Sequence, residues 1–563
     1  MGTATAALER ARPEVSNDVG ADAPSCFPLT APILGVVAVL VGFGATLRLP
    51  GLTSGDLWFD DAWAALPARV NTSTAIHMVV TTPLYSMLLR SYLELHPHSA
   101  SWAQLPAFAF GLIGIVAVFA LVRYFGFGPM ASTLAALLIA TSPVTITYST
   151  RVKEYGFDLV ASCALLWLAE RWRRTPTGER ALACSAAASV GVLASASLAA
   201  VVVPVLLMAL WSAMAEPARR AQAGWVLGGV VSVLLAEYLL WLQRLPVTLA
   251  EYWSNLGTLV GPKGSQPPIV LFTSMFSGLS TGLTGIVGAG SLDTAARGSL
   301  AELQAMVTAL VLAVLIGVVL LPALRRWREL PGPWVVAALV PCTMVVGALL
   351  GLTPLGGGRT DELAYPALVL LLAHGISLLR GMAGQRAAVL IWAMTGVLGL
   401  WLLGVGVTHR AAYPALKVQP VAGELMATEG TIPIVVDPWV AWSWTWADAS
   451  PMQLSTSHTW VPYAQGFHPV SLSSSIYVSP NYFLSSKPIL KISEHHHLLW
   501  YVSVTLGALW PTAPQQVRNH LVHSEIWLSL ERHGWQPNGR LLRQNGVYAA
   551  QLVYHEPPMG TSP

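Results

Sequence analysis

Long apolar runs alternate with short polar segments between residues 31 and 408. Most of these runs have roughly the 20 residues that an α-helix needs to cross the hydrocarbon core of a bilayer. The run 181–214 is too long for one crossing, so we expect two helices that join near Ser195–Ser197. The pattern predicts a polytopic α-helical membrane protein with about eleven transmembrane helices, at 31–49, 103–123, 130–149, 155–170, 181–197, 198–214, 223–243, 303–322, 333–352, 363–379 and 387–408.

The positions of Arg and Lys indicate on which side of the membrane each connection lies, because cytoplasmic loops carry an excess of both. One more crossing at 76–95 would invert every later connection, so we interpret 76–95 as a helix in the outer interface. We therefore expect a multi-pass protein of the plasma membrane with a cytoplasmic N-terminus and a first span that acts as a signal anchor. In this arrangement the cytoplasmic connections hold Arg123; Arg171, Arg173, Arg174 and Arg180; Arg219 and Arg220; Arg325, Arg326 and Arg328; Arg380 and Arg386.

The polar parts of the chain divide into a leader, two long outer loops and a C-terminal domain. Residues 1–30 are predicted to be a disordered cytoplasmic leader, and the outer loops at 50–102 and 244–302 belong to a transmembrane domain at 31–408. An odd number of spans leaves 409–563 outside. In that region β-like runs at 431–437 and 547–553 and a helix near 514–533 predict a small extracytoplasmic α/β domain. A sugar-stacking surface and packing against the membrane are both open for its tryptophans Trp439, Trp442, Trp444 and Trp446.

Composition agrees with a membrane protein and argues against other classes. Hydrophobic residues make up 54% of the 563 residues, and the mean hydropathy is +0.57. The net charge of +3 gives no reason to expect a nucleic-acid partner. Three of the four cysteines lie in predicted spans and Cys26 lies in the leader, so neither a disulfide framework nor a thiolate metal site is expected.

Three polar clusters fall on the predicted outer face, although they are far apart in the sequence. The first is the carboxylate pair Asp60-Asp61, the second spans 148–158 and the third spans 356–366. Adjacent carboxylates repel each other and need hydration, a counter-charge or coordination. Carboxylates that face basic groups at the membrane edge suit a reaction on an anionic lipid headgroup, in which a base activates the acceptor and cations neutralise a phosphate leaving group. The alternative is that these residues are ordinary charges at helix ends.

Four sequence motifs lie within or beside these clusters. Residues 57–63 read Leu-Trp-Phe-Asp-Asp-Ala-Trp, and residues 81–85 read Thr-Thr-Pro-Leu-Tyr. Residues 148–158 follow a Tyr-Ser…Lys-x-Tyr-x-x-Asp pattern, and a glycine-rich Arg segment precedes Tyr-Pro within 356–366. In this order they resemble motifs of the C-type glycosyltransferases that use polyprenyl-phosphate sugars. That group includes protein O-mannosyltransferases, aminoarabinose transferases of lipid A and actinobacterial arabinosyltransferases.

The resemblance implies a GT-C-like fold and an inverting sugar transfer on the extracytoplasmic side. Asp60 would be the general base that deprotonates the acceptor hydroxyl. Asp61, where many members have Glu, would orient the acceptor or help to hold a divalent cation if one is used; the alternative is that it caps a short helix through 62–64. The changed residues at Thr81 and Thr82, where members have His-Pro, leave the subfamily open.

The resemblance also implies which cations bind the donor. Lys153, Arg151 and Arg359 would bind its phosphate, and a guanidinium suits phosphate oxygens because it donates in parallel pairs. The alternative for Lys153 and Arg151 is snorkelling to the membrane interface. Asp158 lies one turn beyond Lys153 and either pairs with it or takes part in the chemistry.

Three further side chains would contact the substrate. They are Tyr85, Tyr155 and Asp361, although both tyrosines also fit an interfacial aromatic belt.

The predicted function is the transfer of a sugar from a polyprenyl-phosphate-linked donor in the bilayer to an extracytoplasmic acceptor, which is a cell-wall glycan, a lipid or a protein. The high content of Ala, Gly, Val and Trp is typical of a high-GC bacterium such as an actinomycete, for which the donor would carry arabinose or mannose. A transporter or lipid flippase is the alternative, but we would expect its ionisable groups near mid-membrane on broken helices. A second alternative is a membrane scaffold whose C-terminal tail binds cell-wall glycan.

Overall fold

The computed structural model of the protein describes the larger part of the helical region and less than half of the C-terminal region. The segments predicted at 1–29, 244–302, 303–322, 356–359 and nearly all of 387–408 lie outside the described residues, as do the side chains of Asp60 and Asp361. The described residues are 30–52, 57, 59–69, 82–96, 99–215, 219–240, 332–349, 361–382, 400, 403–404, 418–428, 432–437, 440, 443–444, 446, 470–471, 476–478, 497–505, 521, 525–544 and 547–555.

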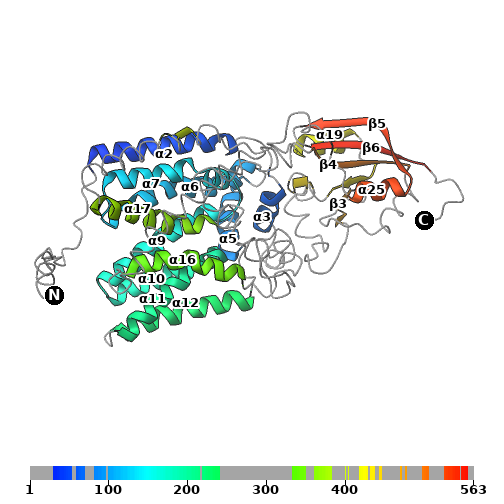
Figure 1. Ribbon diagram of the computed structural model, residues 1–563. Helices are drawn as coiled ribbons and strands as arrows, with labels where there is room; N and C mark the ends of the chain where they lie inside the picture. The colour runs from blue at the N-terminus through cyan, green and yellow to red at the C-terminus, as the bar shows by residue number, and fades with distance from the viewer. Residues whose placement is uncertain are drawn as a thin grey trace, which may run out of the picture.

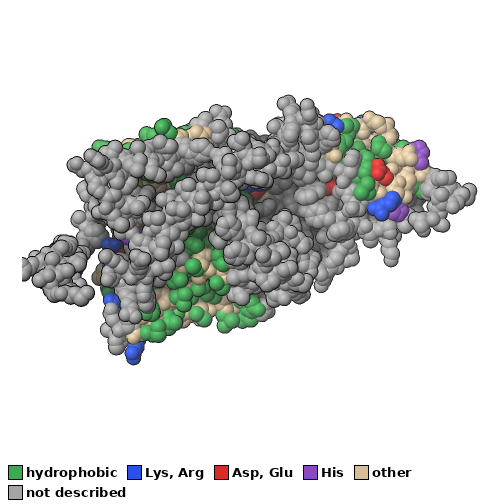
Figure 2. Space-filling model, viewed as in Figure 1, with side chains coloured by type: hydrophobic (Ala, Val, Ile, Leu, Met, Phe, Trp, Pro, Cys, Tyr) green, Lys and Arg blue, Asp and Glu red, His purple; other side chains and the backbone are tan. Residues whose placement is uncertain are grey.

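Long apolar helices lie side by side and form the larger part of the molecule (Figure 1). Within the described residues, α2, α6 and α12 are long and apolar enough to cross a membrane. Large apolar side chains point outward from these helices, for example Val39 on α2 and Trp225 on α12, which are 71% and 72% exposed. Figure 2 shows hydrophobic side chains gathered on the lower side of the helical part, where α12 lies in Figure 1. An outward-facing apolar surface of this kind places the helical part in a membrane. The helices are α2 (Ala31–Leu52), α6 (Ala100–Tyr124), α7 (Pro129–Thr141), α9 (Tyr155–Arg174), α10 (Gly178–Ala194), α11 (Ala199–Ala215), α12 (Arg220–Leu240), α16 (Gly332–Leu349) and α17 (Tyr365–Met382).

Two breaks divide long apolar runs. The break expected near Ser195–Ser197 is confirmed, because α10 ends at Ala194 and the short 3-10 helix η1 (Ala196–Leu198) leads into α11. The single span predicted at 130–149 is wrong, because α7 ends at Thr141 and a separate helix, α8 (Pro143–Tyr148), follows. Ser142 between them has an extended ψ of 123°, the conformation that a following proline favours. This break turns the chain into the polar segment 149–154.

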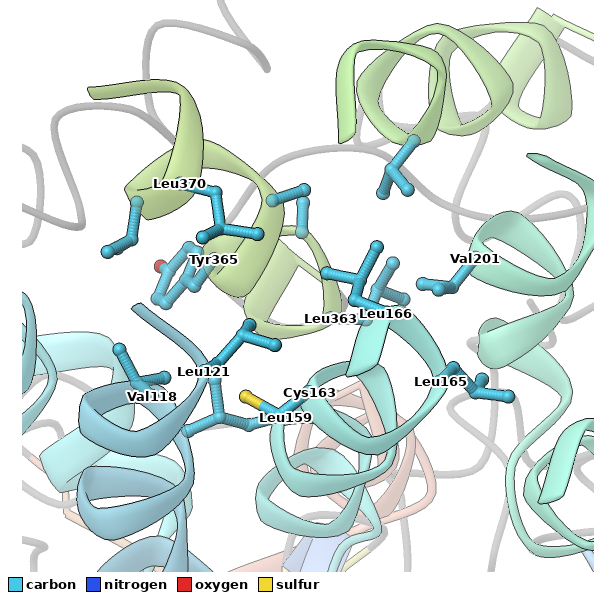
Figure 3. Close-up of a cluster of buried hydrophobic side chains, with 14 of the residues drawn as sticks. Val118, Leu121, Leu159, Cys163, Leu165, Leu166, Val201, Leu363, Tyr365 and Leu370 are labelled. Carbon is cyan, nitrogen blue, oxygen red and sulfur yellow. The ribbon is translucent and has the colours of Figure 1, made fainter. Parts of the chain in front are cut away.

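The helices pack through a buried core in which α6 and α9 meet η5 (Asp361–Ala364) and α17 (Figure 3). Leu121 of α6, Leu159 and Cys163 of α9, and Tyr365 and Leu370 of α17 are at most 4% exposed. Lipid tails are as apolar as leucine, so helices in a bilayer associate mainly through close packing. The core therefore fixes how the ends of α6, α9 and α17 are placed relative to each other.

Two short helices lie at one end of this bundle, between it and a sheet (Figure 1). They are α3 (Phe59–Arg69) and α5 (Pro83–Leu93), and each has 11 residues. Leu66 of α3 and Leu89 of α5 are buried in a shared apolar cluster. At 1.5 Å per residue, α5 is too short to cross a bilayer, as the interfacial interpretation of this segment requires.

The C-terminal region contributes a six-stranded mixed sheet in the order β2-β3-β1-β4-β6-β5. β1 pairs in parallel with β3 and β4, while the remaining pairs are antiparallel. Alternate residues of β1 point to opposite faces: Val436 packs with α19 (Val418–Thr428), and Val435 packs with α25 (Glu525–Arg532). The strands are β1 (Ile434–Val436), β2 (Val470–Ser471), β3 (Ile476–Val478), β4 (Leu498–Val504), β5 (Trp535–Gln544) and β6 (Val547–Tyr554).

Candidate active site

The acidic motif of the first polar cluster is held against the second cluster by a buried ion pair. Asp61 Oδ2 lies 2.5 Å from Arg151 Nη1, and the backbone N–H of Val152 donates to Asp61 Oδ1 at 2.9 Å. Asp61 is 1% exposed and Arg151 is 6% exposed. The helix α3 begins at Phe59, so Asp61 lies inside its first turn and the helix-cap alternative for this residue is wrong. Both carboxylate oxygens of Asp61 thus hold α3 to the segment 149–154.

The two cations of this segment have different surroundings. The Arg151 guanidinium donates to Asp61, so a substantial part of its charge is neutralised inside the protein. The Lys153 ammonium lies 5.5 Å from the centroid of the Trp63 ring, and its side chain is half-buried. Lys153 is therefore on the same side of the segment as α3. Both residues lie beside the acidic motif.

The polar segment is positioned by Arg48, which the sequence analysis did not single out. Arg48 lies in the last turns of α2 and is fully buried. Its Nε donates to Ser149 Oγ at 3.0 Å, its Nη2 donates to Thr145 Oγ1 at 3.1 Å, and its Nη1 donates to the Ala140 carbonyl at 2.9 Å. An arginine inside an apolar run was the available signal, because a buried guanidinium needs partners of this kind.

Glycine allows the same segment to approach α6 closely. A Cβ placed on Gly111 of α6 would lie 2.1 Å from Ser149 Oγ and 2.5 Å from Ser149 Cβ. No side chain fits at that distance, so glycine is required at position 111 for the observed packing. Arg48 and Gly111 both contact Ser149 at the end of α8. They therefore fix the position of the segment that carries Arg151 and Lys153.

Tyr85 of α5 faces this acidic region from the other side. It is 1% exposed, and within the described residues its hydroxyl makes no hydrogen bond. Burial raises the pKa of Tyr85 well above its usual value, and the charges of Glu154, Asp61 and Asp158 raise it further. The start of α5 is tied to the end of α10, because the Thr82 hydroxyl donates to the Ala194 carbonyl. Tyr85 is thus placed among three carboxylates.

Asp158 is a second buried carboxylate at this end of the bundle. It is 1% exposed, and neither of its oxygens has a hydrogen-bond partner among the described residues. The pairing of Asp158 with Lys153 is therefore not formed. The Ser195 hydroxyl at the end of α10 lies near enough to interact with it, and Glu154 and Glu362 repel it electrostatically. Because Asp158 opens α9 while Glu362 opens the helical turn before α17, the packed core brings these acids together.

Glu154 and Tyr155 lie at the end of this segment, where α9 begins. Glu154 is half-buried, and burial raises its pKa while the neighbouring Lys153 opposes that rise. Tyr155 packs edge-on against Tyr148 with a centroid distance of 4.9 Å and an interplanar angle of 81°, so a contact to a neighbouring aromatic ring accounts for its position.

The described residues contain no group of three or more His, Cys, Asp or Glu side chains that is arranged to hold a metal ion. The carboxylates of the site lie close to the cations Arg151 and Lys153. This combination of charges suits a substrate that carries both hydroxyls and an anionic group.

The C-terminal region reaches the site through Trp446. The Arg69 guanidinium at the end of α3 lies 4.6 Å from the centroid of the Trp446 ring, and Arg69 Nη1 donates to the Trp446 carbonyl at 2.9 Å. Trp446 is 3% exposed within the apolar cluster of α3 and α5, and Trp444 is fully buried in the core of the sheet. These two tryptophans are packing residues, so they do not belong to the sugar-stacking surface that the sequence allowed.

Comparisons with known proteins give a sequence match for one segment of the chain and a likeness in fold. Residues 80–241, which run from α5 to α12, match the sequence model of the dolichyl-phosphate-mannose-protein mannosyltransferase family. Among curated proteins, none matches the chain in sequence. The apo structure of ArnT from Cupriavidus metallidurans is similar in fold, with a TM-score of 0.50 and 11% identity over 92% of this chain and 98% of that chain.

Two further solved structures are similar at lower scores. ArnT from Cupriavidus metallidurans bound to undecaprenyl phosphate has a TM-score of 0.49 and 11% identity over 92% of this chain and 98% of that one. The oligosaccharyltransferase of Archaeoglobus fulgidus in complex with Zn and sulfate has a TM-score of 0.47 and 14% identity over 92% of this chain and 72% of that one.

The bundle of long apolar helices is that of a membrane protein, and its fold is similar to that of ArnT. Residues 80–241 are therefore similar in sequence to a mannosyltransferase family, and the chain is similar in fold to ArnT.

Proposed function

We propose that the protein transfers a sugar from a polyprenyl-phosphate-linked donor to an extracytoplasmic acceptor, with inversion at the anomeric carbon. The observation that carries this proposal is the buried pair of Asp61 and Arg151, which fixes the acidic motif of α3 beside Lys153. The matching family is described by its dolichyl-phosphate-mannose donor, a polyprenyl-type phosphate sugar. Cell-wall glycans, lipids and proteins are the acceptor classes that fit an outer-face site.

In the proposed reaction, the Asp60 carboxylate removes the proton from an acceptor hydroxyl. The hydroxyl oxygen forms a bond to the anomeric carbon, while the bond between that carbon and the phosphate oxygen breaks. The products are the glycosylated acceptor, the polyprenyl phosphate and a protonated Asp60, so charge and atoms balance. Because Asp61 is held through both oxygens, the backbone of its neighbour Asp60 is fixed in the first turn of α3.

The cations have separate tasks in this proposal. Lys153 neutralises the charge that develops on the phosphate, and Arg359 is a second phosphate contact. Arg151 holds Asp61 and contributes positive potential to the same region. Asp361 and the tyrosines Tyr85 and Tyr155 would contact the sugar or acceptor.

The orientation is also part of the proposal. The arginines of the described connections, such as Arg123, Arg174 and Arg180, lie at the opposite end of the helices from Asp61 and Asp158. By the positive-inside rule that end is cytoplasmic, which puts the site outside the cell.

Sugar transfer in membranes that contain the full chain tests the proposal. Wild-type membranes should convert a radiolabelled polyprenyl-phosphate mannose or arabinose into a labelled product, and Asp60→Asn should lower the rate about 100-fold or more. Glu94→Gln is the control, because Glu94 is an exposed carboxylate at the same end of the bundle. Full activity of Asp60→Asn would refute the assignment of the base. Movement of an unchanged lipid or solute across vesicles that contain the purified protein would support a transporter instead.

A further inference from the structure

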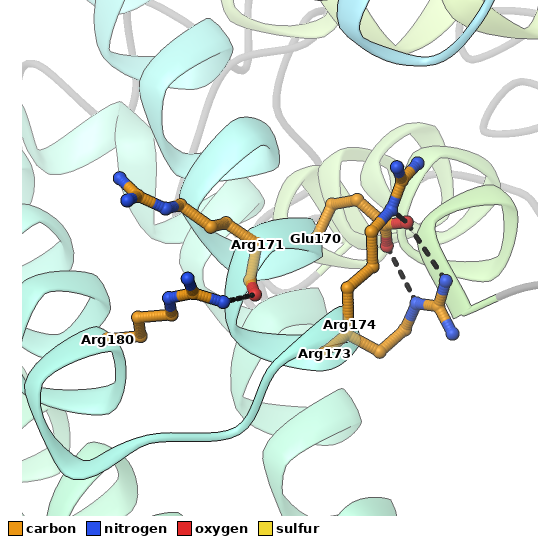
Figure 4. A network of polar contacts seen from close by, with 5 residues as sticks. All are labelled: Glu170, Arg171, Arg173, Arg174 and Arg180. Atoms are coloured by element: carbon orange, nitrogen blue, oxygen red, sulfur yellow. Dashed lines mark hydrogen bonds and ion pairs between the residues drawn. The ribbon is translucent and has the colours of Figure 1, made fainter. Parts of the chain in front are cut away.

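The end of the bundle remote from the site carries a group of arginines whose side chains are held in place. They are Arg171, Arg173 and Arg174 at the end of α9 and Arg180 in the first turn of α10 (Figure 4). Two carboxylates oppose these four guanidiniums, Glu170 and the exposed Glu179, so the group keeps a net charge of +2.

Glu170 forms ion pairs with two of these arginines. Arg173 donates to Glu170 through Nε at 2.7 Å and through Nη2 at 2.9 Å, and Arg174 donates through Nε at 2.6 Å. Glu170 is 1% exposed, whereas the side chains of Arg173 and Arg174 are 31% and 33% exposed. The remaining N–H groups of both arginines therefore keep access to the outside. The buried carboxylate already fixes the geometry of both arginines. They therefore lose little side-chain entropy when they bind a ligand.

Aromatic rings and backbone carbonyls hold the other guanidiniums. Arg171 lies 5.3 Å from the centroid of Trp167, and Arg174 lies 5.1 Å from the centroid of Tyr124 on α6. Arg180 donates to the carbonyl of Thr175 at 3.1 Å, which closes the turn between α9 and α10. The cluster is therefore built from the ends of three helices.

Apolar surface continues from this cluster along the neighbouring helices. Trp172 of α9 donates to Gln222 Oε1 of α12 at 3.2 Å, which ties the start of α12 to the arginine cluster. Leu182 on α10 and Trp225 on α12 lie within two turns of this end and are 63% and 72% exposed. Fixed guanidiniums next to exposed apolar side chains match a molecule with an anionic head and hydrocarbon tails.

We propose that Arg171, Arg173, Arg174 and Arg180 form a binding site for the headgroup of an anionic phospholipid in the adjacent leaflet. The excess of positive charge in cytoplasmic loops explains why arginines are at this end, but it requires neither the buried Glu170 nor the stacked rings. A guanidinium binds phosphate oxygens through parallel N–H donors, and basic pockets between transmembrane helices bind anionic headgroups. The site lies at the opposite end of the bundle from the proposed sugar transfer and does not depend on it.

Lipid binding to the purified full chain tests this site. Native mass spectrometry and thermal unfolding in detergent would be compared for added cardiolipin, phosphatidylglycerol, phosphatidylcholine and inorganic phosphate. We expect the two anionic lipids to bind and to raise the unfolding temperature, whereas phosphatidylcholine and inorganic phosphate should do neither. Equal effects of phosphatidylcholine would overturn the proposal, and an equal effect of inorganic phosphate would indicate a site for soluble anions instead of lipid.

The variants assign the binding to the cluster. Arg171→Gln/Arg174→Gln should weaken binding of the anionic lipids about 30-fold, at roughly fivefold for each guanidinium. Arg543→Gln is the control, since Arg543 is an exposed arginine on β5 in the C-terminal sheet. If the double variant does not fold, the single variant Arg171→Gln still decides the question, because Arg171 makes no contact with Glu170 in Figure 4. Unchanged lipid binding in Arg171→Gln, or an equal loss in Arg543→Gln, would contradict the site.

Discussion

Arg69 and Trp446 join the helix that carries the acidic motif to the C-terminal region. The guanidinium of Arg69 lies 4.6 Å from the centroid of the indole ring and also donates to the Trp446 carbonyl at 2.9 Å. The same end of α3 receives a hydrogen bond from Arg90 of α5, whose Nε donates to the Ala68 carbonyl at 3.2 Å. With Asp61 bound at its other end, α3 is held at both ends, and Asp60 directly precedes the first of these fixed points.

Removing the Arg69 side chain should therefore loosen α3. We expect Arg69→Ala to lower the free energy of unfolding by about 2 kcal/mol, through loss of the cation–π contact and of a buried hydrogen bond. Chemical denaturation of the full chain in detergent measures this. Trp446→Phe is the matched variant, because it keeps an aromatic ring and the backbone carbonyl and should lose less than half as much. Equal losses in both variants would contradict the stacking role of Arg69.

The buried pair of Asp61 and Arg151 predicts a strong asymmetry between single and double variants. Asp61→Asn leaves the Arg151 guanidinium buried without its counter-charge, which should cost about 3–5 kcal/mol. In Asp61→Asn/Arg151→Gln both charges are gone, so much of that loss should be recovered. A double-mutant cycle by thermal unfolding gives the coupling energy, and additive losses would show that the pair does not stabilise the fold.

Gly111 provides a test of how tightly segment 149–154 is packed. A Cβ at this position would overlap Ser149, so Gly111→Ala should destabilise the protein by about 1–3 kcal/mol and lower sugar transfer, because Arg151 and Lys153 shift with the segment. Gly224→Ala on α12 is the control, since nothing lies within 4 Å of its added Cβ. Thermal unfolding and the transfer assay should separate the two variants. Equal stability of both would mean that α6 and the segment are farther apart than described.

The membrane helices could be predicted from sequence because a bilayer imposes one length and one composition on every crossing. The break at Ser142–Pro143 was missed, although its signal was present, because the apolar run continues through the proline. Asp61 and Arg151 were both singled out, yet their pairing was not, since 90 residues separate them and only the packing of α6 and α9 brings them together. Arg48 was not recognised as part of the site, because an arginine near the end of an apolar run also fits snorkelling to the interface.

Tyr85 and Asp158 should recognise the sugar of the donor and not its lipid. Both are buried and have polar oxygens without partners among the described residues, and sugar hydroxyls can donate to a carboxylate and accept from a phenol. We expect Tyr85→Phe and Asp158→Asn each to weaken binding of polyprenyl-phosphate sugar about tenfold, with binding of sugar-free polyprenyl phosphate unchanged. Competition binding with both lipids measures this difference. Glu531→Gln, which changes an exposed carboxylate of α25 in the C-terminal region, is the control, and equal weakening for both lipids would refute a sugar contact.

Glu154 should make the stability of the protein depend on pH. Burial raises its pKa above the usual 4.5, so the folded state binds this proton more tightly than the unfolded state does. Stability from this group is therefore fully present below pH 4.5 and falls as the pH rises from there through the raised pKa of the folded state. Glu154→Gln keeps the shape of the side chain but removes the ionisable carboxyl group. The unfolding temperature of this variant should therefore fall less than that of the wild type across this pH range. Parallel curves for the two proteins, measured by thermal unfolding at a series of pH values, would show that Glu154 does not carry the dependence.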